Sequence, residues 1–268
     1  MNSFLLSALS KLGFASSETP TDDLVAGHAA LVQKDFATAF KKFKRAATQG
    51  NAAAQIEVGH FFRDGLGIRP NLVKAVHWYR LAALQGNVMA QFNLGVIHNN
   101  GEGNLQDFTE AVHWYQLAAL QGHANAQSNL GLMYEKGQGV LQDYAEALNW
   151  YRRASEQGHL VAQFNSGLLY EKGEGTTQNF AEALKWYRLA ALQGHSEAQG
   201  NLGVMYAKGE GVDQDYKSAH MWFNIAAAAG HSVATQNRDA MTQNMNAQQI
   251  SEAQKMARDW QAGRILPG

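Results

Sequence analysis

The sequence has no cysteine and almost no net charge. The absence of cysteine excludes disulfides, thiolate nucleophiles and cysteine-ligated zinc, and it leaves the redox compartment open. The formal net charge of -1 provides no overall field to attract nucleic acid or an anionic membrane surface. No apolar run approaches the roughly 20 residues that a membrane-spanning helix requires. We therefore expect neither nucleic acid as a partner nor insertion into a membrane.

Sequence motifs of enzymes are missing as well. The chain contains no Ser-x-x-Lys, Lys-Thr-Gly or Gly-x-Ser-x-Gly motif and no P-loop. Glycine pairs such as Gly137 and Gly139 lie between predicted helices, without the strand that a dinucleotide site requires. These absences predict a protein that is not an enzyme, with no catalytic residues, no cofactor and no metal.

The first 22 residues allow two interpretations. The apolar stretch 4–9 lacks the basic region and the cleavage site of a signal peptide. Leu5, Leu9 and Leu12 recur at helical spacing, which favours an amphipathic helix that caps the first repeat. A signal peptide is the alternative, so a cytoplasmic location is favoured while a periplasmic or secreted one stays open.

A strict internal repeat determines the expected architecture. Tryptophan recurs every 36 residues with no insertion, at Trp78, Trp114, Trp150, Trp186 and Trp222. Glycine keeps the same spacing at the ends of the repeats, at Gly86, Gly122, Gly158, Gly194 and Gly230. The repeats 1 to 5 are therefore residues 51–86, 87–122, 123–158, 159–194 and 195–230.

Each repeat is expected to form two helices. In repeat 3 the stretch 125–136 places its apolar residues on one face, which predicts a first helix, called helix A. The second helix, called helix B, begins at Asp143, and Glu146 three residues later is typical of a capping box. Gly158 ends helix B. Gly131 lies inside helix A, where glycine costs about 1 kcal/mol relative to alanine. This glycine predicts a close approach of the Trp-Tyr pair of helix B.

The ends of the repeat array differ from its middle, as solenoid caps do. Residues 23–50 are expected to form a shorter helix pair at the N-terminal end. Residues 231–262 are expected to form two closing helices, and Trp260 in the second of them breaks the 36-residue spacing. Residues 263–268 are left as a tail.

Repeat 3 carries a family resemblance. Its key residues are Ala126, Gln127, Leu130, Gly131, Tyr134, Gly137, Gly139, Val140, Gln142, Asp143, Tyr144, Ala147, Trp150, Tyr151, Ala154 and Gly158. This pattern resembles the Sel-one-like repeat (SLR) family, which is related to tetratricopeptide repeats (TPR). The resemblance covers residues 23–260 and implies an all-α fold: a right-handed α/α superhelical solenoid of tandem helix-turn-helix SLR/TPR-like repeats.

The resemblance also implies a function, although fold alone is a weak warrant for one. Members of the family serve as scaffolds or adaptors, with A helices on the concave face and B helices on the convex face. We expect a non-enzymatic scaffold that binds a protein or peptide in its concave groove, with a monomer favoured and the oligomeric state open. The alternatives are a secreted or envelope factor that contacts a host protein or peptidoglycan, and a β-lactam-hydrolase-like enzyme.

The expected groove alternates large side chains with small ones. Phe92 and Phe164 are the expected anchors, and the alternative is that both rings turn into the core between repeats. A column of asparagines could hydrogen-bond a peptide backbone, or could instead link the repeats. The predicted groove residues are Met89, Phe92, Asn93, Val96, Ser128, Asn129, Leu132, Val161, Phe164, Asn165, Leu168 and Asn201.

Histidines also recur every 36 residues at the start of A helices. They are His123, His159, His195 and His231. Stacked repeats separate them by more than one helix diameter, which is too far for shared metal coordination. His60, His77, His98 and His113 cluster in repeats 1 and 2, where a metal site is the alternative, although ring nitrogens on A and B helices should point in different directions. We expect all of these to be surface or interface histidines.

Overall fold

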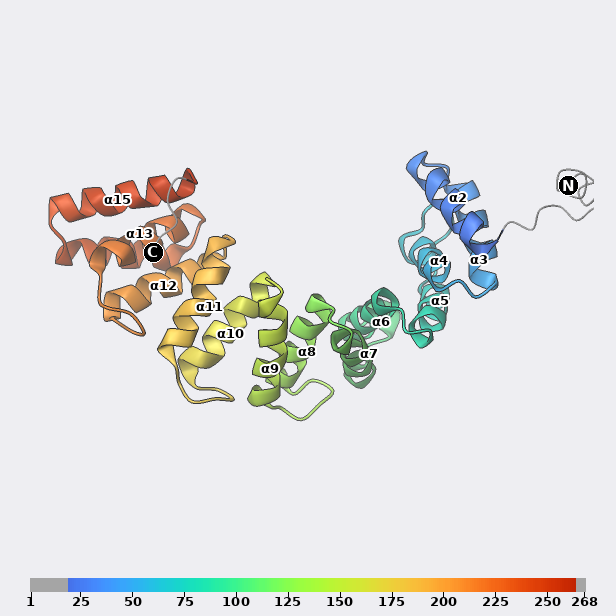
Figure 1. Ribbon diagram of the computed structural model, residues 1–268, viewed down its shortest axis with the longest axis horizontal. Helices are drawn as coiled ribbons and strands as arrows, with labels where there is room; N and C mark the ends of the chain where they lie inside the picture. Colours follow the sequence, from blue (N-terminus) through green and yellow to red (C-terminus); the bar gives the residue numbers. More distant parts are fainter. Residues whose placement is uncertain (1–18, 264–268) are drawn as a thin grey trace, which may run out of the picture. The chain divides into compact units, whose positions relative to one another are not determined.

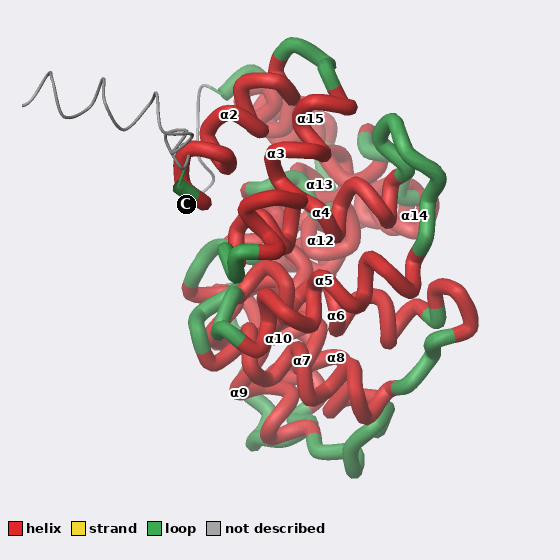
Figure 2. Tube along the Cα trace, turned by 90° about the vertical axis from the view of Figure 1, so that its right-hand side faces the viewer, coloured by secondary structure: helices red, strands yellow, loops and turns green. Residues whose placement is uncertain are grey.

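The computed structural model describes residues 19–263, and within this range the chain consists of helices and connecting loops, with no strand (Figures 1 and 2). The predicted all-α repeat fold is confirmed. The contacts divide the chain into two compact units, an N-terminal unit up to Gln121 and a C-terminal unit from Gly122. The proposed capping helix with Leu5, Leu9 and Leu12 lies outside the described residues, as do residues 264–268. No helix between residues 19 and 263 is both long and apolar enough to cross a membrane.

The N-terminal unit consists of three helix pairs. Its helices are α2 (Pro20–Val32), α3 (Phe36–Thr48), α4 (Ala52–Asp64), α5 (Leu72–Leu84), α6 (Val88–Asn100) and α7 (Phe108–Leu120), with the short 3-10 helix η1 (Glu102–Asn104) before α7. Each α-helix packs against the next one along the chain. The A helices α2, α4 and α6 therefore alternate with the B helices α3, α5 and α7.

The C-terminal unit repeats this arrangement and closes it. Its helices are α8 (Ala124–Lys136), α9 (Tyr144–Glu156), α10 (Leu160–Lys172), α11 (Phe180–Leu192), α12 (Ser196–Lys208), α13 (Tyr216–Ala228), α14 (Ser232–Met241) and α15 (Ala247–Gln261), with η2 (Thr242–Asn244) after α14. A and B helices alternate from α8 to α14, and each contacts the next. The last helix, α15, packs on α13.

The glycine inside each A helix from α2 to α12 makes room for an aromatic ring of its partner B helix. A Cβ atom added to Gly131 would lie 2.8 Å from Cδ1 of Tyr151, and one added to Gly167 would lie 2.6 Å from Cδ1 of Tyr187. Gly203 meets Phe223 in the same way, at 2.5 Å. The predicted close approach is confirmed, and the tyrosine position, one residue after the tryptophan, is the one that fills the space.

The start of each B helix is capped, but not by the full capping box that the sequence predicts. The side chain of Asp143 accepts hydrogen bonds from the backbone N–H groups of residues 145 and 146, at 2.9 and 3.0 Å. The return bond from Glu146 is not formed. In repeat 2 the equivalent glutamate, Glu110, instead accepts a hydrogen bond from the indole nitrogen of Trp114, at 3.0 Å. The glutamate side chain therefore binds the tryptophan indole and does not cap the start of the helix.

Glutamine side chains link successive helices inside both units. In repeat 4, Nε2 of Gln163 donates to the carbonyl oxygen of Ser155 on the preceding B helix, at 3.2 Å. Its Oε1 accepts from Nε2 of Gln193 at the end of α11, at 2.8 Å. The same glutamine pairs occur at Gln55 and Gln85, Gln91 and Gln121, and Gln127 and Gln157. Repeat 5 lacks the second glutamine because Ala229 occupies its position, and the buried Oε1 of Gln199 makes no hydrogen bond with any described residue.

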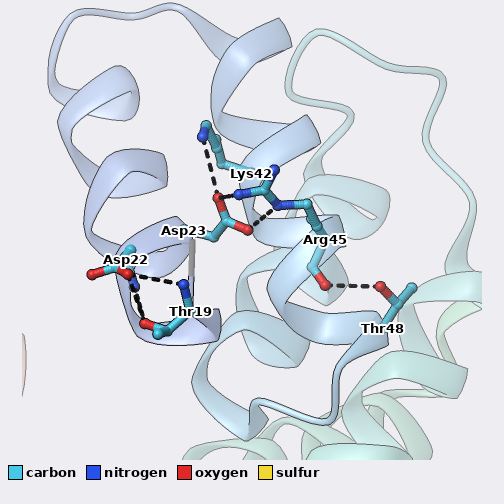
Figure 3. Close-up of polar contacts among 6 residues, drawn as sticks. All are labelled: Thr19, Asp22, Asp23, Lys42, Arg45 and Thr48. Atoms are coloured by element: carbon cyan, nitrogen blue, oxygen red, sulfur yellow. Dashed lines mark hydrogen bonds and ion pairs between the residues drawn. The ribbon is translucent and has the colours of Figure 1, made fainter. Parts of the chain in front are cut away.

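A buried carboxylate fixes the first helix pair (Figure 3). Asp23 on α2 is fully buried and forms ion pairs with Lys42, at 3.2 Å, and with Arg45, both on α3. Thr19 and Asp22 form a complete capping box at the start of the same helix. Since a buried carboxylate is costly without partners, these cations hold α3 against α2.

Candidate binding faces on the A helices

The A helices α4, α6, α10 and α12 each pack between two B helices and leave one side of their surface open. On α10 this side carries Val161, Phe164 and Leu168, at spacings of three and four residues. Val161 is 47% exposed, whereas the other two are half-buried. The open side of α6 carries the same pattern in Met89, which is 48% exposed, and the half-buried Phe92 and Val96. We call these two surfaces the α10 face and the α6 face.

The two phenylalanines pack against neighbouring aromatic rings and are also partly exposed. The ring centroid of Phe164 lies 5.8 Å from that of Tyr187 and 4.3 Å from that of His195, on which it stacks. Phe92 lies 6.0 Å from Tyr115. Each ring therefore supports its repeat, and neither ring is fully buried.

On α8 and α12 small residues occupy the position equivalent to Phe92 and Phe164. Ser128 is buried, and Asn129 and Leu132 beside it are half-buried. On α12 the position belongs to Gly200, where an added Cβ would lie 3.5 Å from the ring of His231. The bulky α10 face thus lies next to smaller side chains on both neighbouring A helices of the C-terminal unit.

Two asparagines of the column are engaged in hydrogen bonds between repeats. Asn165 on α10 donates to the hydroxyl of Tyr151, and this hydroxyl donates to Oε2 of Glu135 at 2.7 Å. Burial, with the carboxylate next to it, raises the pKa of the Tyr151 hydroxyl well above its ordinary value. The hydroxyl is therefore neutral at physiological pH. We call this arrangement a Glu-Tyr-Asn bridge.

A second Glu-Tyr-Asn bridge joins repeats 4 and 5, where Asn201 donates to the hydroxyl of Tyr187 and that hydroxyl donates to Glu171. In the N-terminal unit, Asn93 is buried, and its amide lies 3.3 Å from Nε2 of His60. The amides of these three asparagines thus have partners inside the fold.

The recurrent histidines are helix caps. Nδ1 of His123, His159, His195 and His231 accepts the backbone N–H of the residue three positions later, at 3.2, 3.1, 3.4 and 3.0 Å. Burial lowers the pKa of His123, of His159 and of His195, and for His195 the nearby Glu197 partly opposes this. Within residues 19–263 no group of three or more histidines, aspartates and glutamates could hold a metal ion.

Two exposed leucines at the ends of B helices were missed by the sequence argument. Leu84 and Leu120 are 73% and 63% exposed, and they occupy the same position in repeats 1 and 2. The segment Leu-Ala-Ala-Leu-Gln-Gly recurs there, and a helical projection would have shown that its second leucine points away from the buried alanines.

Comparison with known proteins identifies the repeat. The family model of the Sel1 repeat matches six consecutive segments, at residues 27–51, 52–87, 88–123, 124–159, 160–195 and 196–231. The chain belongs to the Sel1 repeat family. Sel1 repeat proteins are generally protein-interaction scaffolds, and their fold is typically non-catalytic. A comparison with curated protein sequences gives no match.

Two solved Sel1 repeat structures are similar over most of the chain. One is a protective antigen of uropathogenic Escherichia coli that displays an SLR fold, with 32% identity, a TM-score of 0.77 and 91% of this chain covered. The chain spans 54% of the length of that protein. The other is a Sel1 repeat protein from Oxalobacter formigenes, with 33% identity and a TM-score of 0.70, covering 88% of this chain and 96% of the other.

Proposed function

We propose that this protein is a non-enzymatic scaffold or adaptor that binds an extended segment of another protein on the open faces of its A helices. The observation that carries the proposal is the apolar strip on the α10 face, where Val161, Phe164 and Leu168 follow one another at helical spacing and remain partly in contact with solvent. Contiguous apolar surface of this kind is where a protein partner is expected.

The α6 face supports the proposal independently. Met89, Phe92 and Val96 occupy the same three positions on a helix of the other unit. Each face combines an exposed aliphatic residue with an aromatic ring held rigidly by its neighbours. A rigid aromatic surface loses little side-chain entropy on binding, which favours affinity.

The Glu-Tyr-Asn bridges limit the role of the asparagines in this function. Because Asn165 and Asn201 already donate to tyrosine hydroxyls, their main contribution is to fix the A helices against the preceding repeats. Apolar contact with the strips is therefore the main source of affinity in this proposal, and the asparagine carbonyl oxygens are left to accept hydrogen bonds from a partner.

The test uses exposed residues, since replacement of Phe92 or Phe164 would remove packing within the repeats. Met89 and Val161 are each the second residue of their helix, where an aspartate is favourable for the helix dipole. The double variant Met89→Asp, Val161→Asp therefore keeps the fold and places charge on both faces. The matched control is Val73→Asp, Ala181→Asp, which changes exposed residues at the same position of two B helices.

Each protein is immobilised and exposed to lysate of the source cells, and retained proteins are quantified by mass spectrometry after circular dichroism has shown equal helicity. We expect wild type and the control to retain the same partner in equal amounts. The Met89→Asp, Val161→Asp variant should retain at most roughly one tenth of that amount, because an unpaired charge must be buried on binding. Equal retention by both double variants would place binding elsewhere and refute the proposal.

A further inference from the structure

Repeat 5 departs from repeats 3 and 4 at two positions that form one site. Phe223 occupies the position of Tyr151 and Tyr187, and Ala207 occupies the position of Glu135 and Glu171. Phenylalanine has no hydroxyl group and alanine has no carboxylate, so the Glu-Tyr-Asn bridge cannot form there. Asn237 on α14 continues the asparagine column, and its side chain makes no hydrogen bond with any described residue.

A hollow of about 260 Å³ lies at this site, between α12, α13 and α14. Its apolar part is formed by Val204, Ala207, Phe223 and Met241. Its polar edge is formed by Lys208, Asn237 and Asn244. The two substitutions thus replace a polar link between helices with an open apolar depression.

We propose that this hollow is a side-chain pocket that takes one aliphatic residue, the size of leucine, from an extended protein segment with acidic residues beside that aliphatic one. The proposal rests on the proposed scaffold function and names the chemistry of its partner. A volume of about 260 Å³ is smaller than the roughly 300 to 1,000 Å³ of sites for drug-sized molecules, so a single side chain is the suitable occupant.

The charge at the edge of the hollow supports the acidic partner. Lys208 is the one charged residue among the described residues that line it, and no acidic residue does so. Glu210 lies 3.5 Å from the Lys208 ammonium group and keeps it near the edge, while most of the lysine side chain stays exposed. A carboxylate of the partner can share this ammonium group, and the Asn237 amide can donate to and accept from the partner backbone.

The position of the hollow supports an extended segment. Val204 follows Leu168 by 36 residues, so it occupies on α12 the position that Leu168 has on the α10 face. Both lie in the C-terminal unit, on A helices that pack against the same B helix, α11. A segment that contacts the α10 face can therefore continue to the hollow.

The test restores the bridge that the chain itself uses. The double variant Ala207→Glu, Phe223→Tyr recreates the arrangement of repeats 3 and 4 and fills the hollow. A second variant, Ala240→Gln, narrows the hollow from an exposed position on α14 that lines it. Ala181→Glu on α11 serves as the control for added charge, because Ala181 is exposed on a B helix.

The probe is the synthetic peptide acetyl-Gly-Ser-Asp-Leu-Asp-Ser-Gly-amide, titrated into the full-length protein and followed by amide NMR shifts. We expect amide shifts at Ala207, Asn237 and their neighbours. Replacing the leucine of the peptide by alanine should weaken binding roughly tenfold or more. Replacing both aspartates of the peptide by lysine should also weaken binding. Both pocket variants should bind at least about tenfold more weakly than the Ala181→Glu control. Absence of shifts at the hollow, or equal binding by the Ala207→Glu, Phe223→Tyr variant, would overturn the proposal.

The two proposals fail in distinguishable ways. In one case, retention of the lysate partner requires Met89 and Val161, but the pocket variants change neither peptide binding nor partner retention. The scaffold function then stands and the pocket is wrong. If the peptide binds at the hollow while partner retention ignores Met89 and Val161, the pocket stands and the proposed binding faces are wrong.

Discussion

Mild acid is expected to destabilise the A helices of the C-terminal unit through their histidine caps. Nδ1 of His123, of His159 and of His195 accepts a backbone N–H, so it must carry no proton of its own. Protonation removes this acceptor and places a positive charge at the positive end of the helix dipole. The A helices α4 and α6 of the N-terminal unit are capped by Asn51 and Asn87, which do not titrate.

The direction of the effect follows from the pKa shifts. Burial lowers the pKa of these three histidines below their ordinary value of 6.5, so between the folded and unfolded pKa values the unfolded chain binds more protons. Their stabilising contribution is complete above pH 6.5 and is lost as the pH falls toward the folded pKa values. Loss of one cap costs about 1 kcal/mol, and loss of three well-separated caps costs roughly 3 kcal/mol.

Hydrogen exchange measured by mass spectrometry at about pH 7.5 and about pH 5.5, corrected for intrinsic exchange rates, reports this loss helix by helix. We expect protection to fall on α8, α10 and α12 but not on α4 and α6. The variant His123→Asn, His159→Asn, His195→Asn replaces the histidine caps with asparagine, the residue that caps α4 and α6. Its helices α8, α10 and α12 should keep their protection at both pH values. His220, whose pKa is also lowered by burial, is present in both proteins and cancels in the comparison. Equal loss of protection in wild type and variant would refute the reasoning.

Two further substitutions test the structural links inside the units. Ala229→Gln supplies the missing glutamine beside Gln199, so we expect its free energy of unfolding in urea to rise by about 1 kcal/mol, whereas Ala228→Gln, one residue earlier, should change little. A drop in stability with Ala229→Gln would show that the buried oxygen of Gln199 is not available to a glutamine at that position. Arg45→Ala removes one of the two cations paired with the buried Asp23 and leaves Lys42 in place. We expect thermal or urea unfolding to show a loss of about 2 kcal/mol, against less than about 0.5 kcal/mol for the exposed Lys41→Ala. Similar stabilities of these two variants would contradict the assignment of Asp23 as a paired buried charge.

The repeated elements of the fold were predictable because each rests on a local rule. The 36-residue spacing of tryptophan and glycine locates the helix pairs, and Asp143 begins helix B as capping chemistry requires. Gly131 predicts a close contact because glycine destabilises a helix interior and is therefore expected where a neighbouring group leaves no room for a side chain. The ring of Tyr151 is that neighbouring group.

The contacts between side chains could not be predicted in the same way. The sequence left Phe92 and Phe164 either on a groove or in a core, and the structure places each ring against the neighbouring tyrosine with part of it still exposed. The capping glutamate was assigned to a backbone bond, but Glu110 reaches the indole of Trp114 instead. Such partners depend on the distance between side chains on different turns and helices, which a linear pattern does not contain.

The sequence by itself determined the all-α repeat architecture, since 36-residue periodicity, helix caps and glycine positions are encoded within single repeats. Only the tertiary structure decided what the columns of equivalent residues do. Asn165 and Asn201 complete bridges to tyrosines of the preceding repeat, whereas Asn237 borders a hollow because Phe223 and Ala207 supply no polar partner. The reason is physical: a side chain's role depends on what the adjacent helix places opposite it, and that is fixed by helix packing.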